Sequence, residues 1–141
     1  MRIATFNLES LDSGRKARVP MHDRLAVLRP AIQRLNADVL CLQEVNAQKV
    51  SEHKQRELLA LEELLNGTAG VAFHRAVTAG AGGGPADVHN LVTVSRYRIV
   101  SQRQVRHDYV AAPVSAAIPG GPAYFDRPCC RPMSNCRAAK Y

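Results

Sequence analysis

The sequence predicts an α+β fold, and two observations carry the prediction. Residues 2–8 and 38–45 are short apolar stretches typical of strands, and each has a polar residue at or near its end, Asn7 and Glu44. Between them the apolar residues recur at helical spacing, whereas beyond residue 71 they alternate with period two. Both periodicities in a chain of 141 residues indicate one mixed domain at most.

The first helix is predicted after a polar loop over residues 9–21. Pro30 lies inside this helix and cannot donate a hydrogen bond to the carbonyl of Ala26, so we expect a kink or a split. The apolar stripe is formed by Leu25, Leu28, Ile32 and Leu35.

A second helix is predicted between Ser51 and the Asn66-Gly67 pair. Ser51 can cap a helix N-terminus, and Asn66-Gly67 is typical of a helix end. The apolar face is formed by Leu58, Leu61, Leu64 and Leu65.

Three further strands are predicted at residues 71–77, 89–94 and 99–106. The glycine-rich segment 80–85 could be mistaken for a phosphate-binding loop. It lacks the lysine–serine/threonine ending of such a loop and opens no helix, so we interpret it as a flexible connector.

The composition is that of an ordinary globular domain, with 46% hydrophobic residues. No stretch approaches the roughly 20 apolar residues of a membrane span, and the N-terminus lacks the apolar core of a signal peptide. The expected location is therefore the cytoplasm. Cys41 lies in a predicted strand and is expected to be a small core residue.

The formal net charge of +7 suits a polyanionic partner. One function class that follows is a non-catalytic basic module that binds nucleic acid or anionic lipid. However, the basic residues form no dense stripe and tryptophan is absent, so a solvated surface with surplus arginine explains the charge equally.

Asn7 and Glu44 favour a second class, an enzyme with a metal site. A carboxylate or carboxamide at the end of a buried strand is held rigidly at the edge of the sheet, where a hard divalent cation can bind without a charge being buried in the core. Glu44 could also be a solvated strand-end carboxylate and Asn7 a turn-capping residue, and Glu9 could equally supply a ligand.

Three motifs resemble the N-terminal half of the endonuclease/exonuclease/phosphatase superfamily. They are Ile-Ala-Thr-Phe-Asn-Leu (3–8), Ala-Asp-Val-Leu-Cys-Leu-Gln-Glu-Val (37–45) and His-Asn-Leu-Val-Thr-Val-Ser-Arg-Tyr (89–97). This superfamily includes deoxyribonuclease I, abasic-site endonucleases, sphingomyelinases and inositol polyphosphate phosphatases. The resemblance covers residues 1–128 and implies a four-layer α/β/β/α sandwich (deoxyribonuclease I-like), present here only as its N-terminal half.

The resemblance also implies hydrolysis of a phosphoester with Mg²⁺ (or Mn²⁺). Glu44 matches the metal-binding carboxylate, and Asn7 matches the carboxamide beside the metal and the scissile phosphate. Arg96 resembles the arginine of the family's Ser-Arg-Tyr/Phe-Pro turn, and Arg127 matches a basic position near the substrate cleft, so both are predicted to bind substrate. Nucleic acid, phospholipid and sugar phosphate all remain open as the substrate.

His74, His89 and His107 lie on or beside predicted strands without metal-ligand spacing. We interpret each as a structural histidine with satisfied hydrogen bonds.

The family's later motifs, Gly-Asp-x-Asn and Asp-His, do not occur in the sequence. Because a general base and a charge-stabilising group each contribute a factor of roughly 10² or more, the chain in this truncated form is expected to be inactive. From residue 129 the sequence leaves the family's register. We therefore expect a truncated domain over 1–128 and a disordered tail over 129–141, which would follow from a change of reading frame.

A half fold would leave the inner face of its sheet without a partner layer. The sequence therefore predicts an exposed apolar face and possible self-association through it. The residues expected on this face include Phe6, Leu40, Leu42, Leu91 and Val92.

Overall fold

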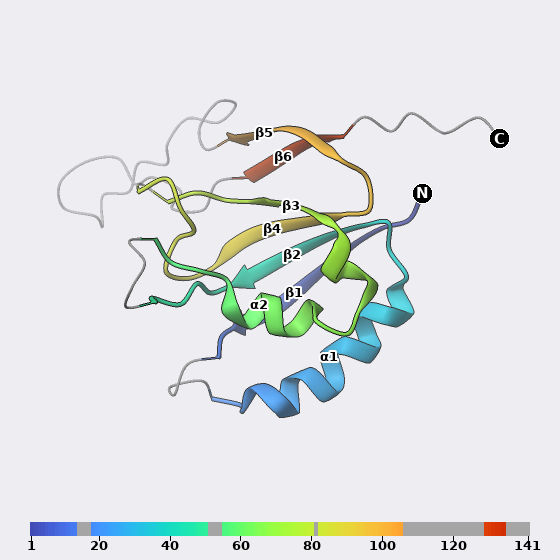
Figure 1. Ribbon diagram of the computed structural model, residues 1–141, viewed down its shortest axis with the longest axis vertical. Helices are drawn as coiled ribbons and strands as arrows, with labels where there is room; N and C mark the ends of the chain where they lie inside the picture. Colours follow the sequence, from blue (N-terminus) through green and yellow to red (C-terminus); the bar gives the residue numbers. More distant parts are fainter. Residues whose placement is uncertain (14–17, 51–54, 81, 106–128, 135–141) are drawn as a thin grey trace, which may run out of the picture.

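The computed structural model describes residues 1–13, 18–50, 55–80, 82–105 and, for the backbone alone, 129–134. Its elements are strands, two α-helices and one short 3-10 helix (Figure 1). In chain order they are β1 (Ile3–Leu11), α1 (Met21–Leu35), β2 (Val39–Val45), α2 (Leu59–Leu65), η1 (Ala69–Ala72), β3 (His74–Val77), β4 (Asn90–Ser95), β5 (Ile99–Val105) and β6 (Cys129–Ser134).

A four-stranded sheet in the order β1-β2-β4-β3 forms the centre of the described part. β1 and β2 are parallel and are joined through α1, which is the predicted strand–helix–strand unit. β4 pairs antiparallel with both β2 and β3. The predicted α+β class is confirmed, and the parallel pairing brings the C-terminal ends of β1 and β2 to one edge of the sheet.

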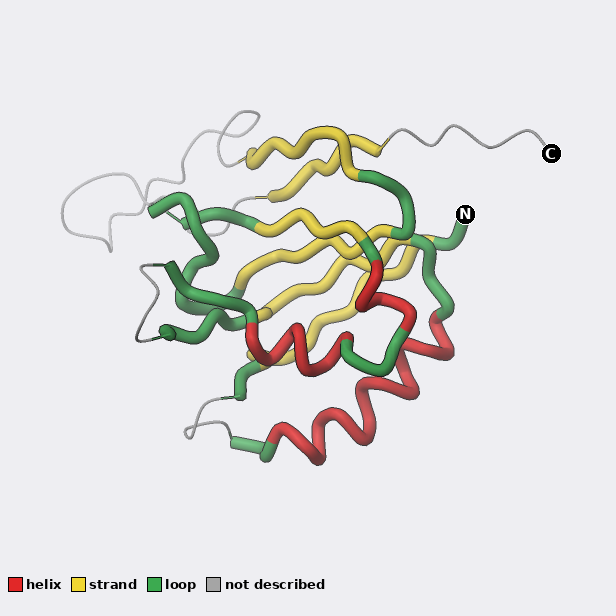
Figure 2. Tube along the Cα trace, in the orientation of Figure 1, coloured by secondary structure: helices red, strands yellow, loops and turns green. Residues whose placement is uncertain are grey.

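Both helices cover the same face of this sheet (Figure 2). Leu25 and Ile32 of α1 and four residues of α2 belong to one core cluster with the inward side chains of the strands. The buried strand residues of this cluster include Leu8, Leu40, Leu42, Val92 and Val94.

The prediction that an apolar face of the sheet is exposed is wrong for most of the residues expected on it. Leu40, Leu42 and Val92 are buried in the core, and Phe6 packs against it, because α1 and α2 supply the covering layer. The opposite face carries the register partners Thr5, Cys41 and Thr93 and also the apolar side chains of Ile3, Val39 and Leu91. Leu91 is half-buried and does not belong to this core, and self-association through a sheet face stays a prediction.

β5 and β6 form a separate antiparallel pair that lies beside β3 and β4. The tail expected to be disordered from residue 129 thus begins with a strand over Cys129–Ser134. Backbone pairing needs no alternation of apolar side chains, and an edge strand tolerates a proline such as Pro132, so the irregular sequence did not reveal this strand. Residues 135–141 lie outside the described part.

α1 is a single element despite Pro30. Pro30 and Ala26 are both exposed, so water can bond the carbonyl that the proline leaves without its helical donor. Of the two predicted outcomes, the helix is not split at Pro30, and the kink stays a prediction.

α2 begins at Leu59, later than the cap at Ser51 predicted, and Ser51 itself lies outside the described residues. Before the helix, Gln48 and Glu57 form an isolated antiparallel bridge with N···O distances of 2.7 and 2.9 Å. The side chain of Gln48 then accepts a hydrogen bond from the amide of Ala60 at 3.3 Å. A residue distant in sequence thus caps the helix, which a local capping signal could not reveal.

None of the helices in the described part of the chain is both long and apolar enough to span a membrane.

Candidate functional site

The predicted pair, Asn7 and Glu44, meets where β1 and β2 end. The strands are in regular register up to Asn7 opposite Gln43, and register resumes at Leu11 opposite Val45. Three residues of β1 therefore stand opposite Glu44 alone, which makes a bulge larger than the ordinary two-against-one type. Bulges of this kind re-aim a side chain at the end of a strand.

The bulge holds its residues in left-handed backbone conformations. Glu9, Ser10 and Glu44 have φ values of 46°, 54° and 58°, and His89, just before β4, has 59°. These are four of the five non-glycine residues with positive φ in the described part of the chain. Such conformations are sparsely populated for non-glycine residues and gather at functional sites, so this edge of the sheet is the strongest candidate for one.

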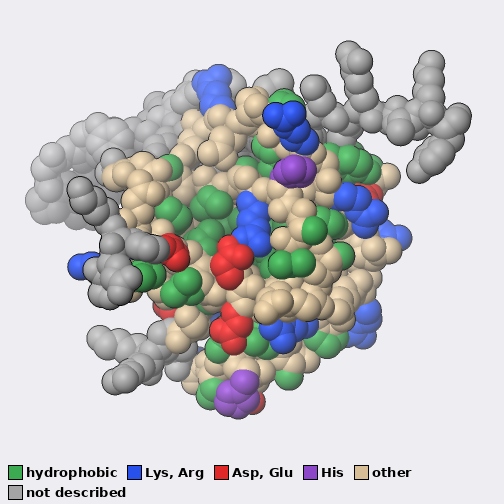
Figure 3. All heavy atoms as spheres, in the orientation of Figure 1, with side chains coloured by type: hydrophobic (Ala, Val, Ile, Leu, Met, Phe, Trp, Pro, Cys, Tyr) green, Lys and Arg blue, Asp and Glu red, His purple; other side chains and the backbone are tan. Residues whose placement is uncertain are grey.

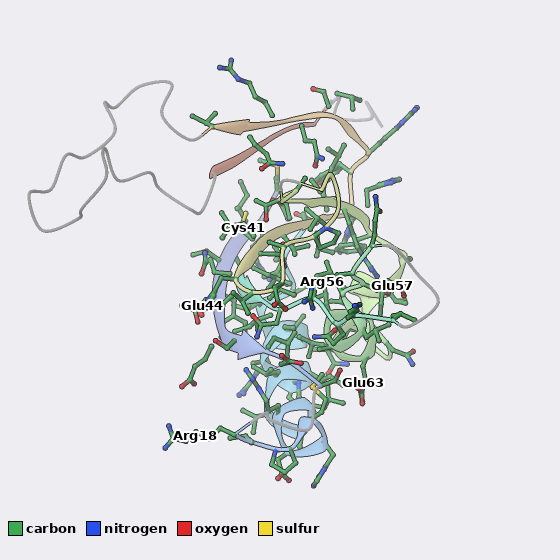
Figure 4. The ribbon with its side chains drawn as sticks, turned by 90° about the vertical axis from the view of Figure 1, so that its left-hand side faces the viewer. Arg18, Cys41, Glu44, Arg56, Glu57 and Glu63 are labelled. Atoms are coloured by element: carbon green, nitrogen blue, oxygen red, sulfur yellow. The ribbon has the colours of Figure 1, made fainter. Side chains whose placement is uncertain are left out.

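The Glu44 carboxylate is oriented from two sides. Asn7 Nδ2 donates to Glu44 Oε1 at 3.1 Å, and the backbone amide of Ser10 donates to Oε2 at 3.2 Å. The carboxamide of Asn7 is itself fixed, because its Oδ1 accepts from the amide of Glu9 at 2.8 Å. The carboxylate keeps contact with solvent, with 26% of the side chain exposed. In Figure 4 Glu44 and Cys41 lie on the side of the sheet away from Arg56, Glu57 and Glu63.

His89 belongs to the same site, which the sequence did not indicate. Its Nδ1 lies 4.0 Å from Glu44 Oε2. Within the described residues this nitrogen is buried and has no hydrogen-bond partner. The interpretation of His89 as a structural histidine with satisfied hydrogen bonds is therefore wrong. The sequence could not show this, because a pattern of strand residues does not reveal the left-handed backbone that orients the imidazole.

A network of polar side chains supports the loops behind Glu44. Asn46 Oδ1 accepts from the His89 amide at 3.0 Å, and Asn46 Nδ2 donates to Asp12 at 3.3 Å. Asn90 Nδ2 donates to the carbonyls of Val45 at 2.9 Å and Ala86 at 2.8 Å. Sequence reasoning missed these residues. Their only signal in the sequence is position, since Asn46 immediately follows the motif that ends at Val45 and Asn90 is the second residue of the motif that begins at His89.

A cavity of about 770 Å³ adjoins the site between the end of β1 and α1. Asn7 and Ser10, the two donors to Glu44, line it together with Arg18 and Arg24. Arg24 donates to the carbonyls of Leu8 and, at 3.2 Å, of Ser10, so this arginine supports the bulge.

The structure does not bring Arg96 to this site. β4 is antiparallel to β2, so Arg96, which follows β4, lies at the start of β2 beside Asp38. Its Nε is 3.4 Å from Asp38 Oδ1, and its guanidinium lies over the ring of Phe73, 5.6 Å from the centroid. At roughly 3.3 Å per residue this is about 20 Å from Glu44. The structure thus places Arg96 beside Asp38 and Phe73, away from Glu44, and its contact with substrate stays a prediction. Arg127 and His107 lie outside the described residues.

Many of the arginines serve internal contacts. On the face that Figure 3 shows, basic and acidic side chains are interspersed and form no single basic patch. Arg29 bonds the carbonyl of Glu63, Arg56 bonds Ala47 and Asp87, and Arg75 pairs with Glu62. The described surface gives no support to a basic stripe for nucleic acid.

The donor atoms fit a site with one carboxylate. Among the described residues no group of three or more His, Cys, Asp or Glu could hold a metal ion. Mg²⁺, however, is usually bound through one or two carboxylates and keeps several waters and substrate oxygens as further ligands. A single Glu44 carboxylate that is oriented and partly exposed suits such an ion.

The chain is similar to known proteins in sequence and in fold. The model of the Endonuclease/Exonuclease/phosphatase family matches residues 4–133. Among solved structures, the chain is similar to an endonuclease/exonuclease/phosphatase family protein from Leptotrichia buccalis C-1013-b, with a TM-score of 0.55 and 17% identity. The similarity covers 94% of this chain and 49% of that one, so the chain spans about half the length of this relative. No curated protein sequence matches significantly.

Proposed function

Because the chain belongs to the endonuclease/exonuclease/phosphatase family, we propose that Glu44 holds a divalent cation, Mg²⁺ or Mn²⁺, at a site for a phosphoester. The observation that supports this most is the orientation of the Glu44 carboxylate by Asn7 and Ser10 inside a strained bulge. Strain of this kind persists only where the surrounding structure enforces it.

In this proposal Asn7 is a positioning residue. Its amide nitrogen donates to Glu44, and its oxygen is engaged by the Glu9 amide, so the observed contacts favour orientation of the carboxylate over direct ligation. A bound divalent ion would polarise a phosphoryl oxygen and offset the charge that develops on it. Arg18 and Arg24 line the adjacent cavity and could attract the anionic substrate into it.

We further propose that the described elements are the first half of a four-layer sandwich. The likeness to the Leptotrichia fold over 94% of this chain supports this. The substrate is a phosphoester, whether nucleic acid, phospholipid or sugar phosphate, and the protein acts in the cytoplasm. Since neither Asp-x-Asn nor Asp-His occurs in the sequence, we expect these 141 residues to bind the metal without measurable hydrolysis.

The test is a titration of the purified chain with Mn²⁺, followed by electron paramagnetic resonance of the free ion. Replacement of Glu44 by Gln keeps the shape of the side chain but removes its charge, and we expect the affinity to fall about 100-fold or more. Asp38→Asn is the matched control, because Asp38 is a carboxylate at the other end of β2.

Unchanged Mn²⁺ affinity in Glu44→Gln would contradict the proposed site. A phosphodiesterase assay on the same samples tests the second part. Turnover that disappears in Glu44→Gln would show that the chain is active and that the expected inactivity is wrong, while supporting the site.

A further inference from the structure

His89 carries an unexplained feature of this site. Within the described residues, its Nδ1 is the buried side-chain atom that has no hydrogen-bond partner. Buried polar atoms in folded proteins are nearly always paired, and each exception requires an explanation such as an ion, a water or a catalytic role. The unpaired nitrogen faces the carboxylate of Glu44, which points to an ion as the explanation.

The separation of the two side chains fits a shared ion better than a direct contact. A hydrogen bond between Nδ1 and a carboxylate oxygen would measure about 2.7–3.2 Å, whereas the observed distance is 4.0 Å. Metal–nitrogen and metal–oxygen bonds of about 2.0–2.2 Å allow two ligand atoms of one ion to lie up to about 4.3 Å apart. The observed distance is inside that limit, and tetrahedral or adjacent octahedral positions on one ion would bring the two atoms to about 3.0–3.4 Å, which a small side-chain movement can supply.

The backbone holds the imidazole in place. His89 is fixed in a left-handed conformation, with φ at 59°, and its amide donates to Asn46 Oδ1 at 3.0 Å. The next residue, Asn90, is buried and anchored to Val45 and Ala86. The turn that presents His89 is therefore tied to the strand that presents Glu44. Such rigidity is what a pair of metal ligands requires.

We propose that His89 is a second protein ligand of the ion at Glu44, and that the site consequently prefers a transition metal with affinity for imidazole, such as Co²⁺ or Zn²⁺, over Mg²⁺. This inference rests on the proposed function, since it assumes that Glu44 binds an ion. Imidazole nitrogen suits Zn²⁺ and its neighbours, whereas Mg²⁺ favours oxygen ligands alone. A carboxylate with an imidazole therefore discriminates between metals more strongly than a carboxylate by itself.

The simplest rival explanation is an ion pair between a protonated His89 and Glu44 without any metal. The two explanations predict opposite changes in metal affinity when the imidazole of His89 is removed. A protonated imidazole competes with a metal ion for the carboxylate, so its removal would leave metal affinity unchanged or raise it. A ligand contributes to binding, so its removal would lower affinity.

The experiment uses the full chain and the variants His89→Gly and His89→Asn. The positive φ accommodates glycine and, less readily, asparagine, so both variants keep the turn while they remove the imidazole. His74→Gln is the matched control, because His74 is exposed at the start of β3. Thermal melts establish that each variant is folded before metal is added.

Pulsed electron paramagnetic resonance of bound Mn²⁺ gives the direct readout. We expect coupling to an imidazole nitrogen in the unmodified chain and in His74→Gln, and its loss in both His89 variants. In competition with Mn²⁺, the affinity for Co²⁺ should fall about 10-fold or more in the His89 variants, while the affinity for Mg²⁺ changes much less.

Two results would overturn the inference. One is nitrogen coupling that is absent from the unmodified chain, and the other is Co²⁺ affinity that stays equal or rises when His89 is replaced. The variant Glu44→Gln shows whether only the role of His89 is wrong or the proposed metal site is wrong as well. If Glu44→Gln abolishes Mn²⁺ binding and the His89 variants do not weaken it, the metal site stands without His89. If Glu44→Gln has no effect, both proposals fail.

Discussion

The two ends of β2 each present a carboxylate, and the two are held in opposite ways. At the start of the strand, Asp38 accepts from the amide of Arg2 at 2.7 Å and pairs with Arg96 Nε at 3.4 Å and with the N-terminal ammonium group at 3.8 Å. At the far end, Glu44 accepts from the carboxamide of Asn7 and the backbone amide of Ser10, which carry no charge.

The backbone conformations at the two ends of β2 also differ. Near Asp38 the left-handed residue is Asn36, which caps α1 and belongs to a residue type that tolerates this conformation. Around Glu44 the left-handed residues are Glu9, Ser10, Glu44 itself and His89. Asp38 is thus neutralised by positive charges on a relaxed backbone. Glu44 accepts from the uncharged donors of Asn7 and Ser10 and lies on a strained backbone.

The largest effect expected from this comparison is on stability at the Asp38 end. Asp38→Ala should lower the free energy of unfolding by about 2 kcal/mol, because it removes a charge-assisted hydrogen bond and an ion-pair partner of Arg96. Urea unfolding followed by circular dichroism measures this loss. Mn²⁺ affinity should stay unchanged. If Asp38→Ala kept its stability but bound Mn²⁺ more weakly, Asp38 would belong to the metal site and its assigned role in stability would be wrong.

The next effect is on metal affinity at the Glu44 end. Asn7→Ala removes the donor to Glu44 Oε1, and loss of an orienting partner typically weakens metal binding by about 10-fold or more. Thr5→Ala is the matched control, since Thr5 is exposed on the same strand and accepts from Gln43 at 2.5 Å. Isothermal titration with Mn²⁺ compares the two variants. Equal affinities would exclude a positioning role for Asn7.

The smallest effect concerns backbone strain in the bulge. Ser10→Gly should raise the free energy of unfolding by up to about 1 kcal/mol, because glycine adopts a φ of 54° without the steric penalty of a side chain. The amide that bonds Glu44 remains, so Mn²⁺ affinity should not change. Ser10→Ala removes the same hydroxyl without relieving the strain, and a gain in stability of similar size there would show that strain is not the cause.

The contrast also explains how far the sequence could predict the site. Asn7 and Glu44 were correctly expected at one edge, because both end apolar segments that flank a helix, and parallel pairing of such strands brings their ends together. The end of the sheet at which Arg96 lies could not be predicted, because the direction of β4 relative to β2 determines it. That direction follows from tertiary packing and leaves no mark on the strand sequence.

His89 and the start of α2 were missed for related physical reasons. A left-handed backbone at a histidine has no signature in hydrophobic periodicity, so the direction of its imidazole was not accessible. The cap of α2 comes from Gln48 through a long-range contact, whereas sequence rules detect capping residues only beside the helix. The covered face of the sheet was misjudged because the expected partner layer was a second sheet and the actual one is α1 and α2.

Gln48 has a consequence for how the molecule opens in solution. Its side chain donates to Asp12 at 3.1 Å, and its backbone pairs with Glu57, while Arg56 donates to the neighbouring carbonyl of Ala47 at 3.1 Å. The loop behind the site and the first turn of α2 therefore share hydrogen bonds and should exchange their amide protons as one cooperative unit. Local unfolding that frees the helix from Gln48 would also loosen the loop that supports His89, so the lifetime of the site is tied to the lifetime of α2.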